Sequence, residues 1–350
     1  MKILKVGIAG YGIVGKKRHQ FINDHPQMTV IAICDQIFSQ DLNAINGVVC
    51  FNDYKQLLKM ELDILFVCLP NFIAAEVTIA GLEKGLHVFC EKPPGKDMAD
   101  IEQVIATEKK FPHLKLKYGF NHRYHDSIRE ALRIIKSGDL GEIVNLRGVY
   151  GKSKIIPFSG GWRSRRELAG GGILLDQGIH MVDLMRLFGG EFNEVKSFVS
   201  NDFWKHDVED NAFALLKNDR GVIAMLNSSA TQWQHKFNLE ISLSKGYIEL
   251  HGILSGSKSY GEEKIVVGTR NEDSDNGQME SRTIKFLQDN SWRDEIFEFA
   301  DSVLNDKSVI SGTSHDALET MRLVFTVYFN DVEWRNNFNI KNPLKIRIDE

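Results

Sequence analysis

The sequence KILKVGIAGYGIVG, residues 2–15, is followed after a helix-compatible segment by MTVIAICD, residues 28–35. The first stretch joins an apolar run directly to the spacing Gly10-x-Gly12-x-x-Gly15, and the second is an apolar run that ends in Asp35. Strand, glycine turn, helix, second strand and terminal acid, in this order, are typical of a βαβ unit that binds a dinucleotide. A glycine turn in some other α/β protein is the alternative.

Each glycine has a physical role in such a unit. Gly10 allows the tight turn, Gly12 lets the backbone approach a pyrophosphate, and Gly15 lets the helix pack close to the strand. The N–H groups at the helix start then bind the phosphates. The predicted cofactor-binding residues of the turn are Gly10, Tyr11, Gly12, Ile13, Val14 and Gly15.

Asp35 predicts which dinucleotide is bound. It lies twenty residues beyond Gly15, where a carboxylate accepts hydrogen bonds from both ribose hydroxyls. The same negative charge repels a 2′-phosphate, so the sequence favours NAD over NADP.

The bulk composition excludes several classes of protein. The chain has 350 residues, enough for two domains, and its formal net charge of −4 gives no electrostatic reason to expect a nucleic-acid partner. The basic cluster of residues 16–19 is too short to change this and is expected to form one solvated helix turn. No apolar run is long enough to cross a bilayer, and the N-terminal stretch reads as a first strand, not a signal peptide.

The four cysteines indicate the compartment. All lie in the first hundred residues and no two have CxxC spacing, so neither a zinc site nor a disulfide framework is expected. Reduced thiols in a cytoplasmic protein are the prediction.

The pattern along the chain predicts two domains. Strand-like and helix-like segments alternate to about residue 120, which favours a Rossmann doubly wound parallel sheet over residues 1–122. Residues 123–350 are expected to form an α/β substrate-binding and oligomerisation domain, an α+β arrangement with an open, mostly antiparallel sheet, because hairpin signals follow one another there. Its expected elements include a helix over 176–188 and a loop or edge ribbon over 255–282. In the first domain we expect a chain break at Pro70-Asn71 before a helix over 74–84, and a sixth strand over 114–120.

Ligands of doubly wound sheets bind at the carboxyl ends of the strands. The cofactor-binding residues predicted at three such ends are Leu69, Pro70, Asn71, Glu91, Lys92 and Asn121. Since Lys92 precedes a proline it is held extended, which suits a fixed cation facing a nicotinamide. A surface lysine in a proline turn is the alternative.

A second set of candidate groups follows the glycine run of residues 170–172. Asp176 and His180 are four residues apart, on one face of a predicted helix, where the carboxylate would fix the tautomer of a general base. No third ligand at a telling spacing accompanies them, so no metal site is predicted. An acid at a helix start and a packed histidine are the alternative.

Taken together, GYGIVG, CLPN, CEKP, GFNHRYH and GGGILLDQGIHMVD resemble the Gfo/Idh/MocA oxidoreductases, which are NAD(P)-dependent sugar and cyclitol dehydrogenases and reductases. The resemblance runs across nearly the whole chain. It implies a Rossmann domain, a second domain whose sheet makes a dimer or tetramer interface, and Lys92, Asp176 and His180 as the catalytic set. Members often carry P-N-x-x-H after the fourth strand, whereas Ala74 replaces that histidine here, which leaves the detail of the nicotinamide pocket open.

The resemblance also implies a substrate. Trp162-Arg163 matches the family's W-R element, and with Tyr150 and Lys152 it would border a sugar, a cyclitol or a nucleotide sugar. The expected reaction is hydride transfer between the nicotinamide and a hydroxyl or keto carbon. Two alternatives stay open: a non-catalytic dinucleotide-binding regulator of the same fold, and a reductase of a non-sugar carbonyl or diol.

Overall fold

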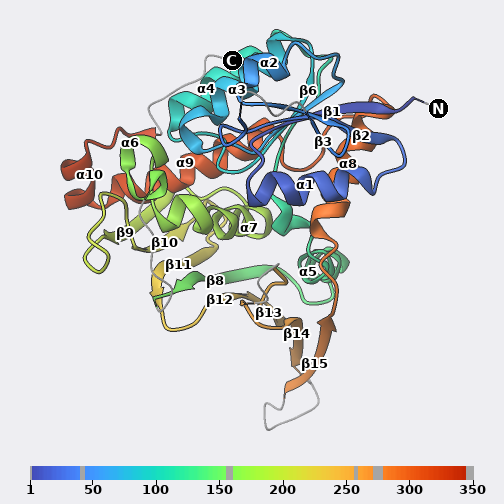
Figure 1. Ribbon diagram of the computed structural model, residues 1–350. Coiled ribbons are helices and arrows are strands. Elements are labelled where there is room, and N and C mark those ends of the chain that lie inside the picture. The colour runs from blue at the N-terminus through green and yellow to red at the C-terminus, as the bar shows by residue number, and fades with distance from the viewer. Residues whose placement is uncertain (1, 40–43, 155–160, 256–258, 271–278, 344–350) are drawn as a thin grey trace. The chain divides into compact units, whose positions relative to one another are not determined.

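The computed structural model describes residues 2–39, 44–154, 161–255, 259–270 and 279–343. The chain forms two compact units, each described by itself below (Figure 1). The first unit contains residues 1–121, 167–170 and 292–318, and the second contains residues 122–166, 171–291 and 319–350. The first crossing of the chain between the units falls between Asn121 and His122, and the division into residues 1–122 and 123–350 stays a prediction. The return of residues 292–318 to the first unit has no counterpart in the sequence analysis.

The first unit is built on a seven-stranded sheet with the order β3-β4-β2-β1-β5-β6-β7. All neighbouring strands are parallel except β3 and β4, so the predicted doubly wound sheet is confirmed. The strand order reverses beside β1, the position where such sheets bind ligands. The strands are β1 (Leu4–Ala9), β2 (Met28–Cys34), β3 (Ala44–Ile45), β4 (Val48–Phe51), β5 (Ile64–Val67), β6 (His87–Cys90) and β7 (Leu116–Tyr118).

Helices connect these strands: α1 (Ile13–Asn23), α2 (Tyr54–Leu57), α3 (Asn71–Glu83) and α4 (Met98–Glu108). Two boundaries differ from the prediction. The sixth predicted strand is shorter than expected, since β7 covers only three residues. The expected break before residue 74 is wrong, because α3 begins at Asn71 directly after Pro70, its N-cap. A proline is tolerated there because the first N–H groups of a helix have no partner within the helix.

Helix α8 (Ser291–Leu304) completes the core of the first unit. Phe66 of β5 and Phe89 of β6 stack with ring centroids 4.8 Å apart, and Phe299 of α8 meets Phe89 edge-on at 5.6 Å. All three rings are buried. Edge-on contacts of this kind stabilise the core beyond the contribution of the apolar area that the rings remove from water.

Arg18 corrects one prediction. The basic cluster of residues 16–19 was expected to be a solvated turn, yet the Arg18 side chain is fully buried. Its Nε donates to Glu91 Oε1 at 2.6 Å, and its Nη1 lies 2.8 Å from Glu295 Oε2. The guanidinium lies 4.4 Å from the ring centroid of Phe89 and 4.3 Å from that of Trp292. Burial raises the pKa of the Glu295 carboxyl to about 7 even though Arg18 opposes that shift.

The second unit contains an eight-stranded open sheet with the order β15-β14-β13-β12-β8-β11-β10-β9. Only β8 and β11 pair in parallel, as the prediction of a mostly antiparallel sheet requires. The strands are β8 (Ile143–Ser153), β9 (Glu194–Ser200), β10 (Asn211–Lys217), β11 (Ile223–Gln232), β12 (Lys236–Leu243), β13 (Gly246–His251), β14 (Glu263–Arg270) and β15 (Met279–Phe286).

Within the region expected to be a loop or edge ribbon, residues 263–270 and 279–282 lie in strands, whereas residues 255 and 259–262 do not. Strands β14 and β15 pair antiparallel and extend the sheet at its edge (Figure 1). Residues 256–258 and 271–278, which fall in the same expectation, lie outside the described residues.

The remaining helical segments include one that differs from its prediction. They are η1 (Asn121–Tyr124), α5 (Asp126–Ser137), η2 (Trp162–Ser164), α6 (Arg166–Ala169), η3 (Leu174–Gly178), α7 (Ile179–Gly189), α9 (Ser314–Asn330) and α10 (Val332–Phe338). The single helix predicted over 176–188 is instead the π-helical turn η3 followed by α7, which packs on β8 and β11. Single π-helical turns are rare in proteins, and those that occur often lie at functional sites. Over the described residues, no helix has the length and apolar character that a membrane crossing needs.

Replacing Arg18 with methionine tests the buried ion pairs. The Arg18→Met variant keeps the apolar stem but leaves the carboxylates of Glu91 and Glu295 without their buried cation, so we expect the free energy of unfolding in urea to fall by about 3–5 kcal/mol. The matched control is Lys217→Met, because Lys217 pairs with Glu194 at an exposed position. That change is expected to cost less than about 0.5 kcal/mol. Equal losses in the two variants would contradict the assignment.

Candidate functional site

The glycine turn after β1 has the shape that the spacing predicts. Gly10 has φ +91°, and a Cβ atom there would lie 2.2 Å from the carbonyl oxygen of Cys68. A Cβ atom on Gly15 would lie 2.0 Å from the carbonyl oxygen of Gly10. Gly12, the N-cap of α1, is different, because a Cβ atom there would meet nothing within 4 Å. The turn therefore leaves open space at the start of α1, where backbone N–H groups attract anions.

Asp35 is fixed against this turn. The backbone N–H of Tyr11 donates to Asp35 Oδ2 at 2.7 Å, and that of Ile37 donates to Oδ1 at 3.2 Å. The carboxylate stays half-exposed, so lone pairs remain for a ligand. Ile13 at the start of α1 is 89% exposed, whereas Val14 is half-buried. A ligand lying along the turn would cover the exposed apolar side chain of Ile13.

The carboxyl ends of β5, β6 and β7 bring the other predicted cofactor residues to the same sheet edge. Leu69 and Pro70 follow β5, and the buried Asn71 starts α3, where its Nδ2 donates to the carbonyl oxygen of Ala169 at 2.7 Å. Asn121 follows β7 and is buried at the start of η1. Asn71 thus has a structural partner, which the sequence did not indicate.

Glu91 and Lys92 follow β6 and have different surroundings. Glu91 is buried and accepts from Arg18, which belongs to the same helix α1 that begins at the glycine turn. Lys92 is half-buried, and a cis peptide bond joins it to Pro93. One buried guanidinium therefore connects the glycine-turn helix to the residue next to Lys92.

In the second unit, Asp176 lies in the π-helical turn η3 between two cations. Lys152 Nζ of β8 is 3.6 Å from Asp176 Oδ2, and Arg163 Nε of η2 is 3.6 Å from Asp176 Oδ1. The Arg163 guanidinium lies 4.3 Å from the ring centroid of Trp162. The structure thus brings together four of the residues predicted from the sequence: Lys152, Trp162, Arg163 and Asp176.

His180 is buried in the first turn of α7 and stacks on a second imidazole. The ring centroids of His122 and His180 are 3.7 Å apart and their planes differ by 13°. His122 Nε2 and Tyr150 Oη are 3.2 Å apart, at hydrogen-bonding distance. Burial raises the pKa of Tyr150 well above its usual range, so its hydroxyl keeps its proton near neutrality.

Three residues around this pair were not predicted from the sequence. His122 belongs to the quoted segment GFNHRYH but was given no role, and only its contact with His180 reveals one. Tyr260 donates its hydroxyl to Gln177 Oε1 at 2.9 Å, and its ring centroid is 5.3 Å from that of Tyr150. The contacts of Tyr260 join residues more than eighty positions apart, so no local pattern could have indicated them.

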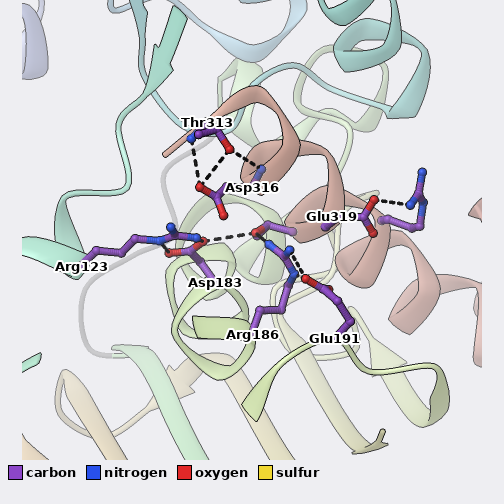
Figure 2. Close-up of polar contacts among 9 residues, drawn as sticks. Arg123, Asp183, Arg186, Glu191, Thr313, Asp316 and Glu319 are labelled. Atoms are coloured by element: carbon purple, nitrogen blue, oxygen red, sulfur yellow. Dashed lines mark hydrogen bonds and ion pairs between the residues drawn. The ribbon is translucent and has the colours of Figure 1, made fainter. Parts of the chain in front are cut away.

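A buried ion pair also fixes α7 at Asp183, one turn beyond His180. Figure 2 shows Arg123 pointing at Asp183, with Nε and Nη2 donating to the two carboxylate oxygens at 2.7 and 2.6 Å. Thr320 donates to Asp183 Oδ1 at 3.3 Å and accepts from Arg186 Nη1 at 2.6 Å. Bidentate pairs fix orientation as well as charge, so α7 is held in one rotation. Within the described ranges, no three His, Cys, Asp or Glu side chains gather as metal ligands.

Comparisons with known proteins give a separate match for each of the two parts of the chain. Residues 4–118 match the model of an oxidoreductase family with an NAD-binding Rossmann fold, and residues 128–249 match the GFO/IDH/MocA C-terminal domain. The chain is similar to the D-glucoside 3-dehydrogenase of Escherichia coli, with 30% identity over 65% of this chain and 70% of that protein.

Solved structures share the fold over nearly the whole chain. A myo-inositol 2-dehydrogenase from Lactobacillus plantarum has a TM-score of 0.76 and 26% identity over 94% of this chain and 97% of that one. A levoglucosan dehydrogenase in complex with NADH and L-sorbose has a TM-score of 0.83 and 18% identity over 95% and 98% of the two chains, and it supports the fold alone.

Two alanine substitutions separate the structural glycine from the ligand-facing one. Gly10→Ala forces a side chain into a positive φ and a clash, so we expect the free energy of unfolding to fall by at least about 1–3 kcal/mol. Gly12→Ala adds a methyl group to open space, so stability should stay at the wild-type value while dinucleotide affinity, measured by calorimetry, falls at least about tenfold. A stable Gly12→Ala protein with wild-type affinity would show that the ligand does not approach this turn.

Proposed function

The chain belongs to the GFO/IDH/MocA oxidoreductase family, and we propose that it moves hydride between NAD and a CH–OH carbon of a sugar-like substrate. The observation that carries this proposal is the hydrogen bond from the glycine turn at Tyr11 to Asp35, which fixes a carboxylate beside the open start of α1. With a dinucleotide bound along this turn, its nicotinamide would supply the hydride acceptor for the alcohol or the donor for a carbonyl.

The choice of NAD over NADP rests on Asp35. Its carboxylate is held by two backbone N–H groups and remains half-exposed. A ribose with two hydroxyls can donate to it, whereas a 2′-phosphate would meet its negative charge. The family includes both cofactor classes, so this preference is specific to the residue at position 35.

We assign complementary roles to the three predicted catalytic residues. His180 takes the proton of the substrate hydroxyl, because an imidazole is the side chain best suited to exchange a proton near neutral pH. Lys92 holds the same oxygen and stabilises the negative charge that develops on it. Asp176, flanked by Lys152 and Arg163, orients the substrate and the imidazole.

The surroundings of Asp176 favour a polyhydroxylated substrate. Lys152 and Arg163 supply donors, Asp176 supplies acceptors, and Trp162 offers an apolar ring beside them. Alternating donors and acceptors of this kind match neighbouring hydroxyl groups on a sugar or cyclitol, and the two cations also fit a phosphate handle. The chain is similar to a D-glucoside 3-dehydrogenase and to inositol 2-dehydrogenases, and the names of these relatives give such compounds as their substrates.

The rival proposal, a regulator that binds a dinucleotide without turnover, has no need for a base or an ammonium group. The burial of His180 against a second imidazole favours an enzyme over a regulator. Burying two titratable rings costs free energy, which a catalytic function for them would explain. Steady-state assays over sugars, inositols and nucleotide sugars with NAD separate the two proposals, because a regulator would bind NAD without reducing it.

Lys92→Ala tests the catalytic assignment. Removing the ammonium group should lower kcat/KM by about 10²–10³-fold, the usual cost of one donor to a developing oxyanion, while the NAD dissociation constant stays at the wild-type value. The control is Lys84→Ala, an exposed lysine at the end of α3, which should leave both values unchanged. Near-wild-type turnover in Lys92→Ala would remove Lys92 from the mechanism.

We further propose that the chain assembles as a homodimer or homotetramer through the second-unit sheet. Apolar side chains on β9, β10 and β11 are exposed, and Phe198 and Phe213 lie directly opposite each other across two of these strands. Contiguous apolar surface of this kind marks interaction sites. The exposed members are Phe198, Phe213, Leu215, Ile223 and Met225.

Light scattering tests that assembly. The double variant Phe198→Ser, Phe213→Ser should have the mass of one 39.8 kDa chain, whereas the wild type should have twice or four times that mass. Leu287→Ser is the control, because Leu287 is equally exposed but follows β15 at the opposite edge of the sheet. An unchanged mass in the double variant would place the interface elsewhere.

All four cysteines are free, which supports a reducing compartment, and we propose the cytoplasm.

A further inference from the structure

The glycine run before Asp176 is packed against buried protein groups. A Cβ atom on Gly172 would lie 2.1 Å from the carbonyl oxygen of Glu209, and one on Gly171 would lie 2.3 Å from the hydroxyl of Tyr328. Close approach to these two residues therefore requires glycine at both positions. Gly171 and Gly172 thus let this backbone approach Tyr328 and Glu209.

Glu209 binds three successive amides at the start of the segment that carries Asp176 and His180. Its Oε2 accepts from the N–H of Gly172 at 2.7 Å, and its Oε1 accepts from that of Leu174 at 2.9 Å. Its backbone oxygen accepts from the N–H of Ile173 at 3.1 Å. The first N–H groups of a helix have no partner within it, so one residue from a distant segment supplies all three.

The Glu209 side chain is buried and surrounded by donors. The Tyr328 hydroxyl donates to its Oε1 at 2.6 Å, and Arg166 Nη2 lies 3.9 Å from its Oε2. Burial raises the pKa of the Glu209 carboxyl, and Arg166, Tyr328 and Gly172 oppose that shift. A carboxylate with several donors is held in one orientation, so its amide partners are also fixed.

From this geometry we infer that Glu209 is a positioning residue for the catalytic pair, an inference that rests on the proposed function. The N–H of Asp176 donates to the carbonyl oxygen of Gly172 at 2.8 Å, so the residue that Glu209 anchors in turn holds Asp176. His180 follows one turn later, on α7. Glu209 thereby sets the register of the π-helical turn that directs Asp176 toward Lys152 and Arg163.

Glu209→Gln tests this inference with little change in shape. The new amide NH₂ would face an N–H donor, so one of the two side-chain contacts with Gly172 and Leu174 must be lost. We expect kcat to fall at least about tenfold while the NAD dissociation constant stays unchanged, since misplacing a reacting group costs turnover rather than cofactor binding. Amide hydrogen exchange over residues 172–180 should also become faster, a readout that does not depend on activity.

The matched control is Tyr328→Phe. It removes a donor from the same carboxylate but leaves the amides of Gly172 and Leu174 bound, so kcat should stay within about twofold of wild type even where stability falls. The inference is overturned if Glu209→Gln keeps wild-type kcat and exchange rates, or if both variants lose kcat in proportion to their stability.

His180→Ala, assayed in parallel, separates this inference from the proposed function. If that variant keeps wild-type turnover, the assignment of the base fails, and the positioning role fails with it. If turnover depends on His180 while Glu209→Gln is unaffected, only the positioning role is lost.

Discussion

The first unit depends on one buried cation. Arg18 lies on the helix that begins at the glycine turn, and its guanidinium is shared by Glu91 after β6 and Glu295 of α8. Removing this charge from water is costly unless both carboxylates and the flanking rings of Phe89 and Trp292 stay in place. The cation therefore links three segments far apart in sequence: the helix that begins at the glycine turn, the strand end that carries Lys92, and helix α8 near the end of the chain.

The second unit uses the opposite charge for the same purpose. Glu209 is a buried carboxylate that binds three backbone amides, and it fixes the start of the segment that carries Asp176 and His180. In both units a buried charge lies behind a functional segment. Charged groups have strict geometric requirements when buried, so they hold backbone in one arrangement where apolar packing alone would tolerate several.

The features that could be predicted from the sequence are those that residues close together in the chain encode. The glycine spacing and Asp35 predicted a Rossmann sheet, and the hairpin signals predicted the open antiparallel sheet, because each depends on residues close together in the chain. Prediction from the sequence failed where a role depends on a distant partner. Arg18 reads as part of a basic run, although Gly15, Arg18 and Ile22 share the buried stripe of α1. The sequence assigned the glycine run of residues 170–172 no role of its own, whereas Glu209, 37 residues from Gly172, accepts a hydrogen bond from it.

The same reasoning explains why the π-helical turn was missed. Spacing of four residues predicts one helix face for Asp176 and His180, yet a wider turn changes which neighbours Asp176 meets. Its ion pairs with Lys152 and Arg163, together with the stack of His180 on His122, show that the two side chains have separate surroundings. The turn thus gives Asp176 and His180, only four residues apart, different surroundings: two cations beside the carboxylate and a stacked ring against the imidazole.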